Sequence, residues 1–228
     1  MKREILITSD GSTTIHLPDW NEQYHSKHGA IQEANHVFIK HGLAYFINSD
    51  FYINSHQISI LEIGFGTGLN TFITLLETIK HNLNINYVGV EAYPVLAEEI
   101  KKLNYVDELN ANHFQDNFDK IHDSSWEEKH QIKEYFSLTK RKQFFKDIKD
   151  LEQFDIVYFD AFGARVQPEL WTEAIFEIMF KALKSKGILV TYSAKGSVRR
   201  ALQSVGFTVE RLPGPPGKRE MLRAIKNI

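Results

Sequence analysis

The sequence predicts an α/β protein built around one mainly parallel β-sheet. Strand-like apolar runs alternate with helix-like segments from Ile58 onward, a pattern that indicates strands joined by crossover helices. A glycine-rich turn, Gly64–Gly68, separates the first apolar run from the helix that follows it. The run Phe154–Phe159 is apolar at all but one position, as expected of a strand that is buried on both faces.

An N-terminal extension is expected to precede this sheet. Glu4–Thr8 and Ser12–Leu17 alternate in strand fashion around Asp10-Gly11, a two-residue turn signal that predicts a β-hairpin. Residues 25–47 carry apolar side chains at helical spacing and predict a helix. The predicted domain limits are therefore 1–50 for the extension and 51–228 for the α/β domain.

Seven strands and four longer helices are expected in the α/β domain, with an antiparallel strand at the C-terminal end. The predicted strands are Ile58–Ile63, Asn86–Glu91, 132–140, Phe154–Phe159, Gly187–Tyr192, Phe207–Arg211 and Glu220–Ile225. The predicted helices are Leu69–Lys80, a helix opening at Pro94, Pro168–Leu183 and Ser197–Ser204. Residues 104–131 are polar and poorly periodic, which predicts short helices and loops.

Composition places the chain among soluble globular proteins. Of 228 residues, 43% are hydrophobic and 25% charged, and no apolar run approaches the roughly 18 residues that cross a bilayer. The N-terminus lacks the apolar segment of a secretory signal. The absence of cysteine excludes disulfides and thiolate metal sites, and His25 and His28 have no evident third ligand. We therefore expect a cytoplasmic protein without a membrane segment or a metal.

The net charge of −2 conceals a basic C-terminal segment. Residues 181–228 carry eleven Lys and Arg against two Glu. Such an asymmetry favours a basic face for a polyanion, although a solvated surface is the simpler alternative. The residues expected to contact a polyanion are Lys195, Arg199, Arg200, Lys218 and Arg219.

The glycine-rich turn indicates a cofactor site. Its spacing is G-x-G-x-G, with Glu62 two positions before the first glycine, whereas dinucleotide sites read G-x-G-x-x-G. Glycine lets the backbone approach a ligand closely, and this spacing suits S-adenosylmethionine, which has no pyrophosphate. Glu62 can face the cationic methionine end of that ligand, or it can be a solvated strand residue. The predicted cofactor residues are Glu62, Gly64, Phe65, Gly66, Thr67, Gly68, Asn70, Glu91 and Asp160.

Among these, Glu91 has a distinct expected role. It ends the second predicted strand, 23 residues after Gly68. A carboxylate at that place can accept hydrogen bonds from both ribose hydroxyls. A glycine turn followed by a terminal acid in one βαβ unit favours a nucleotide-type cofactor.

The end of the buried strand Phe154–Phe159 supplies the candidate catalytic residues. Asp160 and Phe162 follow it at the edge where open α/β sheets place their chemistry. The carboxylate can deprotonate an amine and the ring can stack on a base, while helix capping is the alternative role for Asp160. Asp160 is the first candidate for the proton acceptor and Tyr24 the second.

Ordered motifs extend from one end of the chain to the other. They are Asp10–Ser12, Tyr24–Ser26, Gly29-Ala30, Glu62–Asn70, Phe159–Phe162, Gln167–Thr172, Thr191–Gly196, Val198–Arg200, Gly206-Phe207 and Gly217–Met221. Together they resemble the methyltransferase family of MnmC-type enzymes, including its stand-alone MnmD-like members. The resemblance covers nearly the whole sequence.

The resemblance implies a Rossmann-like class I methyltransferase dependent on S-adenosylmethionine. Its expected substrate is the 5-aminomethyl group of the modified wobble uridine in the tRNA anticodon loop, and its product is 5-methylaminomethyl-(2-thio)uridine. Bifunctional relatives add an FAD-dependent oxidase domain, which is not expected here. A separate FAD-dependent or tRNA-modifying protein would then supply the precursor.

One stretch departs from the family pattern. Relatives carry a Gly-Asp pair that holds the adenine amino group, whereas Lys140–Asp147 offers Gln143-Phe144 or Lys146-Asp147 at that place. The adenine contact is therefore left open by the resemblance.

Three other functions stay open from the residues. A methyltransferase acting on a small molecule or a protein would leave the basic segment without a role. A non-catalytic RNA-binding module would not bind S-adenosylmethionine. An NAD-dependent dehydrogenase is disfavoured by the glycine spacing.

Overall fold

The computed structural model describes residues 2–50, 52 and 57–227. Its main sheet has eight strands in the order β10-β11-β9-β8-β4-β5-β7-β6, and a separate three-stranded sheet has the order β1-β2-β3. The small sheet comprises β1 (Glu4–Ile7), β2 (Thr13–Leu17) and β3 (Glu22–Gln23). The main sheet comprises β4 (Ile58–Ile63), β5 (Ile85–Val90), β6 (Lys129–Lys133), β7 (Phe136–Arg141), β8 (Phe154–Phe159), β9 (Leu183–Thr191), β10 (Thr208–Pro213) and β11 (Glu220–Ile225).

The predicted fold class is confirmed by the pairing of these strands. The five strands β7, β5, β4, β8 and β9 pair in parallel, and β11 lies antiparallel between β9 and β10. The structure adds β6, an antiparallel edge strand, and the single strand predicted over 132–140 is divided between the end of β6, a turn and β7. The turn between β6 and β7 places Tyr135 at φ 64°, a left-handed conformation that is usually signalled by glycine or asparagine. Because tyrosine occupies that position, the sequence carries no turn signal that would predict the hairpin.

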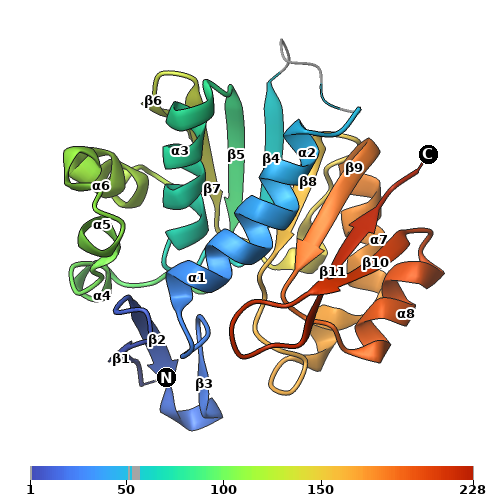
Figure 1. Cartoon of the computed structure of the whole chain (residues 1–228), viewed down its shortest axis with the longest axis horizontal. Coiled ribbons are helices and arrows are strands. Elements are labelled where there is room, and N and C mark those ends of the chain that lie inside the picture. The colour runs from blue at the N-terminus through green and yellow to red at the C-terminus, as the bar shows by residue number, and fades with distance from the viewer. Residues whose placement is uncertain (1, 51, 53–56, 228) are drawn as a thin grey trace.

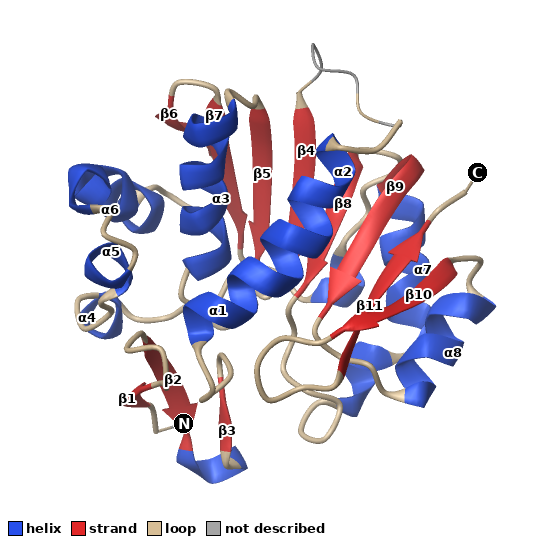
Figure 2. Cartoon of the chain, viewed as in Figure 1, coloured by secondary structure: helices blue, strands red, loops and turns tan. Residues whose placement is uncertain are grey.

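Helices cover both faces of the main sheet (Figure 2). One face carries a continuous helical run formed by α1 (Ala30–Ala34), the π-helix η2 (Asn35–Leu43) and α2 (Ala44–Ile47), together with α3 (Leu69–His81). The other face carries α7 (Glu173–Ala182) and α8 (Gly196–Ser204). Shorter helices lie at one end of the sheet: α4 (Ala97–Ile100), α5 (Tyr105–Glu108), η3 (Asn112–Phe114) and α6 (Gln115–Asp123).

Three predicted helix limits were wrong. The helix expected from residue 25 begins at Ala30, because Gly29 has φ 135° and breaks the helical backbone before it. The helix expected at Pro94 begins at Ala97 and ends after one turn, at Ile100. A 3₁₀ turn, η5 (Pro168–Trp171), precedes α7, and Leu183 already belongs to β9.

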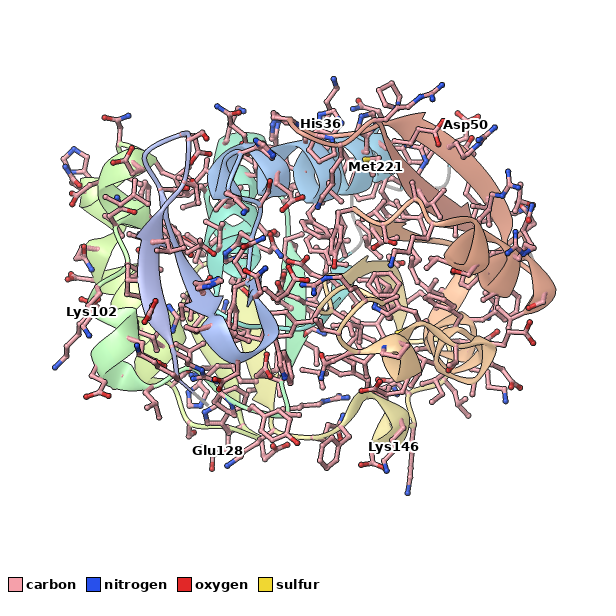
Figure 3. The ribbon with its side chains drawn as sticks, turned by 90° about the horizontal axis from the view of Figure 1, so that it is seen from below. His36, Asp50, Lys102, Glu128, Lys146 and Met221 are labelled. Carbon is pink, nitrogen blue, oxygen red and sulfur yellow. The ribbon has the colours of Figure 1, made fainter. Side chains whose placement is uncertain are left out.

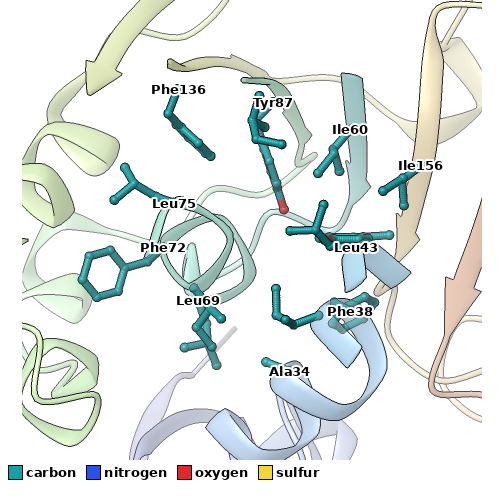
Figure 4. Packing of buried hydrophobic residues seen from close by; sticks show 14 of the residues in the cluster. Ala34, Phe38, Leu43, Ile60, Leu69, Phe72, Leu75, Tyr87, Phe136 and Ile156 are labelled. Atoms are coloured by element: carbon teal, nitrogen blue, oxygen red, sulfur yellow. The ribbon is translucent and has the colours of Figure 1, made fainter. Parts of the chain in front are cut away.

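The alternation of strand side chains produces two hydrophobic layers. Ile60, Tyr87 and Ile156 face the helical run 30–47 and α3, where Phe38 and Leu43 pack against them (Figure 4). The neighbouring strand positions face α7 and α8 instead. The helix of the N-terminal extension therefore shares a core with the sheet. The predicted domain limit at 50/51 involves residue 51, which lies outside the described residues, and stays a prediction.

The parallel strands end at the edge of the sheet that faces the N-terminal hairpin. Figure 1 shows β2 and β3 beneath the carboxyl ends of β4, β5 and β8. Figure 3 looks onto this edge, with the N-terminal strands in front, the short helices on one side and the C-terminal strands on the other. The glycine-rich turn and Asp160 both lie at this edge, because each directly follows a parallel strand.

Candidate active site

The glycine-rich turn follows β4 in a strained backbone path that only glycine adopts readily. Gly64, Gly66 and Gly68 have φ of 90°, 49° and 72°. The N–H groups of Gly64 and Phe65 both donate to the Val90 carbonyl at 3.0 Å, which holds the turn against the end of β5. A Cβ atom on Gly64 would lie 2.6 Å from the carbonyl oxygen of Asp160. The turn is therefore pressed between the ends of β5 and β8.

The carboxylate of Glu91 lies directly beside this turn. One oxygen, Oε2, accepts the Gly66 N–H at 3.1 Å, and Oε1 accepts the Tyr93 N–H at 2.9 Å. The side chain stays partly exposed, so lone pairs remain for hydroxyl donors of a ligand. The structure thus brings together the glycine turn and the terminal acid that the sequence predicted as parts of one site.

A shared amide connects Glu62, beneath the turn, with Asp160. Asn70 Nδ2 donates to Glu62 Oε1 and to Asp160 Oδ2, each at 2.9 Å, and Thr71 Oγ1 donates to Glu62 Oε2 at 3.0 Å. Glu62 is fully buried; its predicted alternative as a solvated strand residue was wrong. The other amide atom, Asn70 Oδ1, is buried without a hydrogen-bond partner. An acceptor in that state is suited to a cationic or N–H donor from a ligand.

Burial shifts the protonation of both carboxyls. Removal from water raises the pKa of Glu62 to about 8. It also raises the pKa of Asp160 to about 7, with a further upward contribution from the charge of Glu33. A carboxyl with a pKa near 7 is suited to act as a general base at neutral pH.

A cavity of about 280 Å³ lies next to Asp160, between the N-terminal extension and the C-terminal strands. Residues from four parts of the chain form its walls. They are Glu22–His28 and Glu33, Ala161–Gly163, Tyr192, and Gly217-Lys218.

Aromatic rings line the cavity on the N-terminal side. The ring of Phe162 meets Tyr24 edge-to-face at 4.9 Å between centroids and Trp20 at 5.8 Å. Tyr24 also covers Gly66, since a Cβ there would be 3.1 Å from Tyr24 Cδ1. Burial raises the pKa of Tyr24, so its phenol keeps its proton at neutral pH and is a poorer proton acceptor than Asp160.

The predicted polyanion-binding residues occupy different environments. Lys218 reaches into the cavity, where Nζ pairs with Glu33 and lies 3.8 Å from the centre of the Tyr192 ring. Lys195 and Arg200 are exposed at the start of α8, and the partly buried Arg199 has no partner for Nε. Arg219 is exposed beside Lys218. Lys218 is therefore not a free surface cation, whereas the charges at the start of α8 are available to solvent.

Sequence reading missed a contact between the N-terminal extension and the glycine-rich turn. His25 Nδ1 lies 3.2 Å from Thr14 Oγ1, and Nε2 lies 3.4 Å from Thr67 Oγ1. The hydroxyl of Tyr105 donates to the same Thr67 oxygen at 3.0 Å. Burial lowers the pKa of His25 to about 4, so the ring is neutral in this network.

Two exposed aromatic rings lie in the region where the adenine contact is expected, for which the sequence named no residue. Tyr93 follows β5, and Phe144 follows β7 within the stretch that departs from the family pattern. The rings are 63% and 50% exposed and meet edge-to-face at 6.1 Å. Exposed rings beside Glu91 are suited to a flat base, and an aromatic residue two positions after Glu91 was the available sequence signal.

Within residues 2–50, 52 and 57–227, no three His, Asp or Glu side chains are grouped so as to hold a metal ion. No helix in the described part of the chain has both the length and the apolar character needed to cross a membrane.

Comparison with known proteins identifies the family. Residues 99–227 match a family described as S-adenosyl-L-methionine-dependent methyltransferase. The chain is 29% identical over 96% of its length to the tRNA 5-methylaminomethyl-2-thiouridine biosynthesis bifunctional protein MnmC of Hydrogenovibrio crunogenus, and 28% identical over 95% to that of Leptospira interrogans. It covers 33% and 34% of these two proteins, so it spans about a third of their length.

Solved structures agree with this result. The structure of MNMC2 from Aquifex aeolicus has a TM-score of 0.73 and 28% identity, with 98% of this chain and 70% of that chain covered. Spermidine synthase from Thermotoga maritima has a TM-score of 0.57 and 14% identity, with 99% of this chain and 69% of that chain covered, and shares the fold. The glycine turn, the carboxylates at the strand ends and the family match agree: the chain belongs to the S-adenosyl-L-methionine-dependent methyltransferases.

Proposed function

We propose that this enzyme methylates the 5-aminomethyl group of the modified wobble uridine in tRNA, giving 5-methylaminomethyl-(2-thio)uridine. The observation that carries the proposal is the position of Asp160, whose pKa is about 7, directly before the segment Ala161–Gly163 that lines a cavity with aromatic rings in its wall. A base with an amine substituent needs both features, one to take a proton and one to pack on the ring. The printed names of the MnmC relatives support the same substrate class.

The residues at the turn fit S-adenosylmethionine, which supplies a methyl group already activated on a sulfonium. The glycines at Gly64–Gly68 carry no side chain, so the turn can approach the methionine part closely, and the unpartnered Asn70 Oδ1 can accept a hydrogen bond from its ammonium group. Glu91 can accept from the ribose hydroxyls, and Tyr93 and Phe144 can pack on the adenine. Glu62 supports this site from beneath by fixing Asn70.

Asp160 prepares the nucleophile. A primary amine is mostly protonated near pH 7, and only its free lone pair can attack the methyl carbon as the carbon–sulfur bond breaks. Asp160 takes one proton from the ammonium and is held in place by Asn70. Phe162 and Tyr24 pack on the uracil ring, and the hydroxyl of Tyr192, which donates to the Ala161 carbonyl at 2.8 Å, fixes the backbone between Asp160 and Phe162.

Basic residues outside the cavity bind the tRNA backbone in this proposal. Lys195, Arg199 and Arg200 follow β9, which ends at the same edge of the sheet as β8. Arg219 lies in the loop that also carries Lys218. A tRNA substrate also places the enzyme in the cytoplasm, where a separate FAD-dependent or tRNA-modifying protein would supply the aminomethyl precursor.

The direct test is methyl transfer to defined tRNA. The chain is incubated with S-adenosylmethionine and tRNA that carries the 5-aminomethyl wobble base, and the digested nucleosides are identified by mass. We expect conversion to the methylaminomethyl form, and no conversion of the same tRNA with an unmodified wobble base. Asp160→Asn should lower the transfer rate by about 100-fold with little change in cofactor affinity. Equal transfer to both tRNAs, or to a small amine alone, would contradict the proposal.

A further inference from the structure

An ion pair is built into the wall of the substrate cavity. Glu33 projects from α1 and is 7% exposed, and Lys218 comes from the loop between β10 and β11. Lys218 Nζ donates to Glu33 Oε1, and the Ser26 N–H donates to Glu33 Oε2 at 2.9 Å. Lys218 Nζ also lies 3.8 Å from the centre of the Tyr192 ring, a cation–π contact. Ser26, Glu33, Tyr192 and Lys218 all line the cavity.

The loop that carries Lys218 is packed tightly against the N-terminal extension. Gly217 has φ 80°, and a Cβ atom there would lie 2.2 Å from His28 Cδ2. A larger residue at 217 would be strained at this φ and would have to displace the His28 ring or the loop. The position of Lys218 thus depends on the contact of its loop with His28, as well as on its attraction to Glu33.

The pair faces Asp160 with opposite charges. The negative charge of Glu33 raises the pKa of Asp160, and the positive charge of Lys218 lowers it. Asp160 also interacts with Glu62 beneath the turn and with Tyr192 on the opposite wall. His25 interacts with Glu33 and Lys218, and Glu22 with Tyr192. Loss of either member of the pair would leave an uncompensated charge close to Asp160.

We propose that Glu33 and Lys218 are positioning residues: the ion pair balances the charge in the cavity so that Asp160, rather than Glu33, receives the proton of the substrate amine. This inference rests on the proposed methyl transfer to an amine. Lys218 occupies one oxygen of Glu33 with a hydrogen bond, and Glu33 in turn holds the Lys218 ammonium in the cavity wall. The two residues together set the pH range over which Asp160 is an effective base.

Opposite single substitutions and their combination test the pair. Lys218→Met leaves the charge of Glu33 without its partner, which should raise the pKa of Asp160. The acidic limb of the plot of kcat/KM against pH should then move to higher pH by about one unit, the smallest shift expected from a neighbouring charge. Glu33→Gln leaves Lys218 unneutralised, so the limb should move to lower pH. The double variant removes both charges and should return the limb close to that of the parent enzyme. Lys218→Arg keeps the charge and should leave the limb in place.

A second measurement does not depend on the substrate. The side-chain carboxyl of Asp160 is followed by ¹³C NMR against pH in the same variants, with Arg211→Met as the matched control. Arg211 belongs to the same hairpin and pairs with Glu220 at 3.7 Å, but it does not line the cavity. We expect the Asp160 titration to shift upward in Lys218→Met and downward in Glu33→Gln, and to stay unchanged in Arg211→Met.

The outcomes separate this inference from the proposed function. Identical Asp160 titrations in the parent and both single variants would overturn the role of the pair. Shifts of the same sign in both single variants would also overturn it, because they would indicate a structural disturbance. A third outcome combines the expected Asp160 shifts in the two variants with a parent enzyme that does not methylate aminomethyl tRNA. That outcome would overturn the proposed function, and with it the assignment of the amine proton.

Discussion

The proposed cofactor side and the proposed substrate side of the candidate active site are constructed differently. The cofactor side comes largely from one βαβ segment, residues 58–91, and depends on backbone conformation and on neutral donors such as Asn70 and Thr71. The substrate side joins residues 22–33, 160–163, 192 and 217–218, and contains a charged pair. A site formed by backbone conformation should be sensitive to substitutions that add atoms. A site that depends on an ion pair should be sensitive to the loss of one of the two charges.

The buried glutamates Glu62 and Glu33 show the same contrast. Glu62 is surrounded by an amide and a hydroxyl, and burial raises its pKa to about 8, so it is largely neutral near pH 7. Glu33 is paired with the lysine ammonium of Lys218. A carboxyl beneath the cofactor turn is thus stabilised by neutral donors, whereas a carboxyl in the substrate cavity is stabilised by a counter-charge.

The largest expected effect comes from adding atoms to the cofactor side. Gly64→Val places a branched side chain at φ 90°, where its Cβ would lie 2.6 Å from the Asp160 carbonyl oxygen. The left-handed conformation alone costs ~1–3 kcal/mol, and the overlap displaces the turn from β8. We expect S-adenosylmethionine affinity to fall by at least about 100-fold, measured by calorimetric titration with folding checked by circular dichroism.

Gly163→Ala is the matched control for this variant. A Cβ atom at 163 would meet Tyr192 Oη at 3.7 Å and Glu22 Oε2 at 3.9 Å, which are ordinary contacts. Cofactor affinity should match that of the parent enzyme. A folded Gly64→Val protein that binds S-adenosylmethionine as the parent does would place the cofactor site elsewhere.

A smaller effect is expected from the protonation of Glu62. Its pKa is about 8 in the folded chain, above the ordinary 4.5. The folded chain therefore holds this proton more tightly, and the resulting stabilisation is complete below pH 4.5 and lost as pH rises through about 8. Glu62→Gln is permanently neutral and keeps an acceptor for Asn70. We therefore compare the free energy of unfolding of Glu62→Gln with that of the parent at pH 5 and at pH 8. The difference, variant minus parent, should be larger at pH 8 by at least about 1.4 kcal/mol, the equivalent of one pKa unit.

Urea denaturation of both proteins at the two pH values measures this gain. Glu98→Gln, a change at an exposed carboxylate, serves as the control and should show no such gain. An equal stability difference between Glu62→Gln and the parent at pH 5 and pH 8 would mean that Glu62 is ionised in the folded protein.

The smallest effect is expected at the start of α8. Replacing Arg199 and Arg200 with Ala should weaken tRNA binding and make the plot of log affinity against log salt concentration less steep. Each phosphate contact to a single-stranded loop contributes about 0.7 to this slope, so the loss of two contacts should reduce it by up to about 1.4. Affinity for S-adenosylmethionine should not change. Lys181→Ala, which removes a cation paired with Glu177 on α7, is the control. An unchanged slope in the folded double variant would assign these arginines to covering apolar surface.

Most strands of the sheet and the glycine-rich turn could be predicted from the sequence, because their signals are local. Strands β4, β8 and β11 have the predicted limits, since short apolar runs bounded by polar residues allow few alternatives. The proximity of Gly66 and Glu91 follows from parallel pairing of β4 with β5, which brings consecutive strand ends to one edge. These features depend on periodicity and on the special conformations of glycine.

Which charges pair with one another depends on the tertiary structure. Glu33 and Lys218 are 185 residues apart, and no spacing rule connects them. Lys218 pairs with Glu33 in the cavity, and its expected contact with a polyanion stays a prediction. The contact between His25 and Thr67 and the hairpin turn at Tyr135 also lack a local signal. Side-chain charge acts through space and burial, which the order of residues does not specify. The pKa of Asp160 near 7 therefore results from packing between four separate segments.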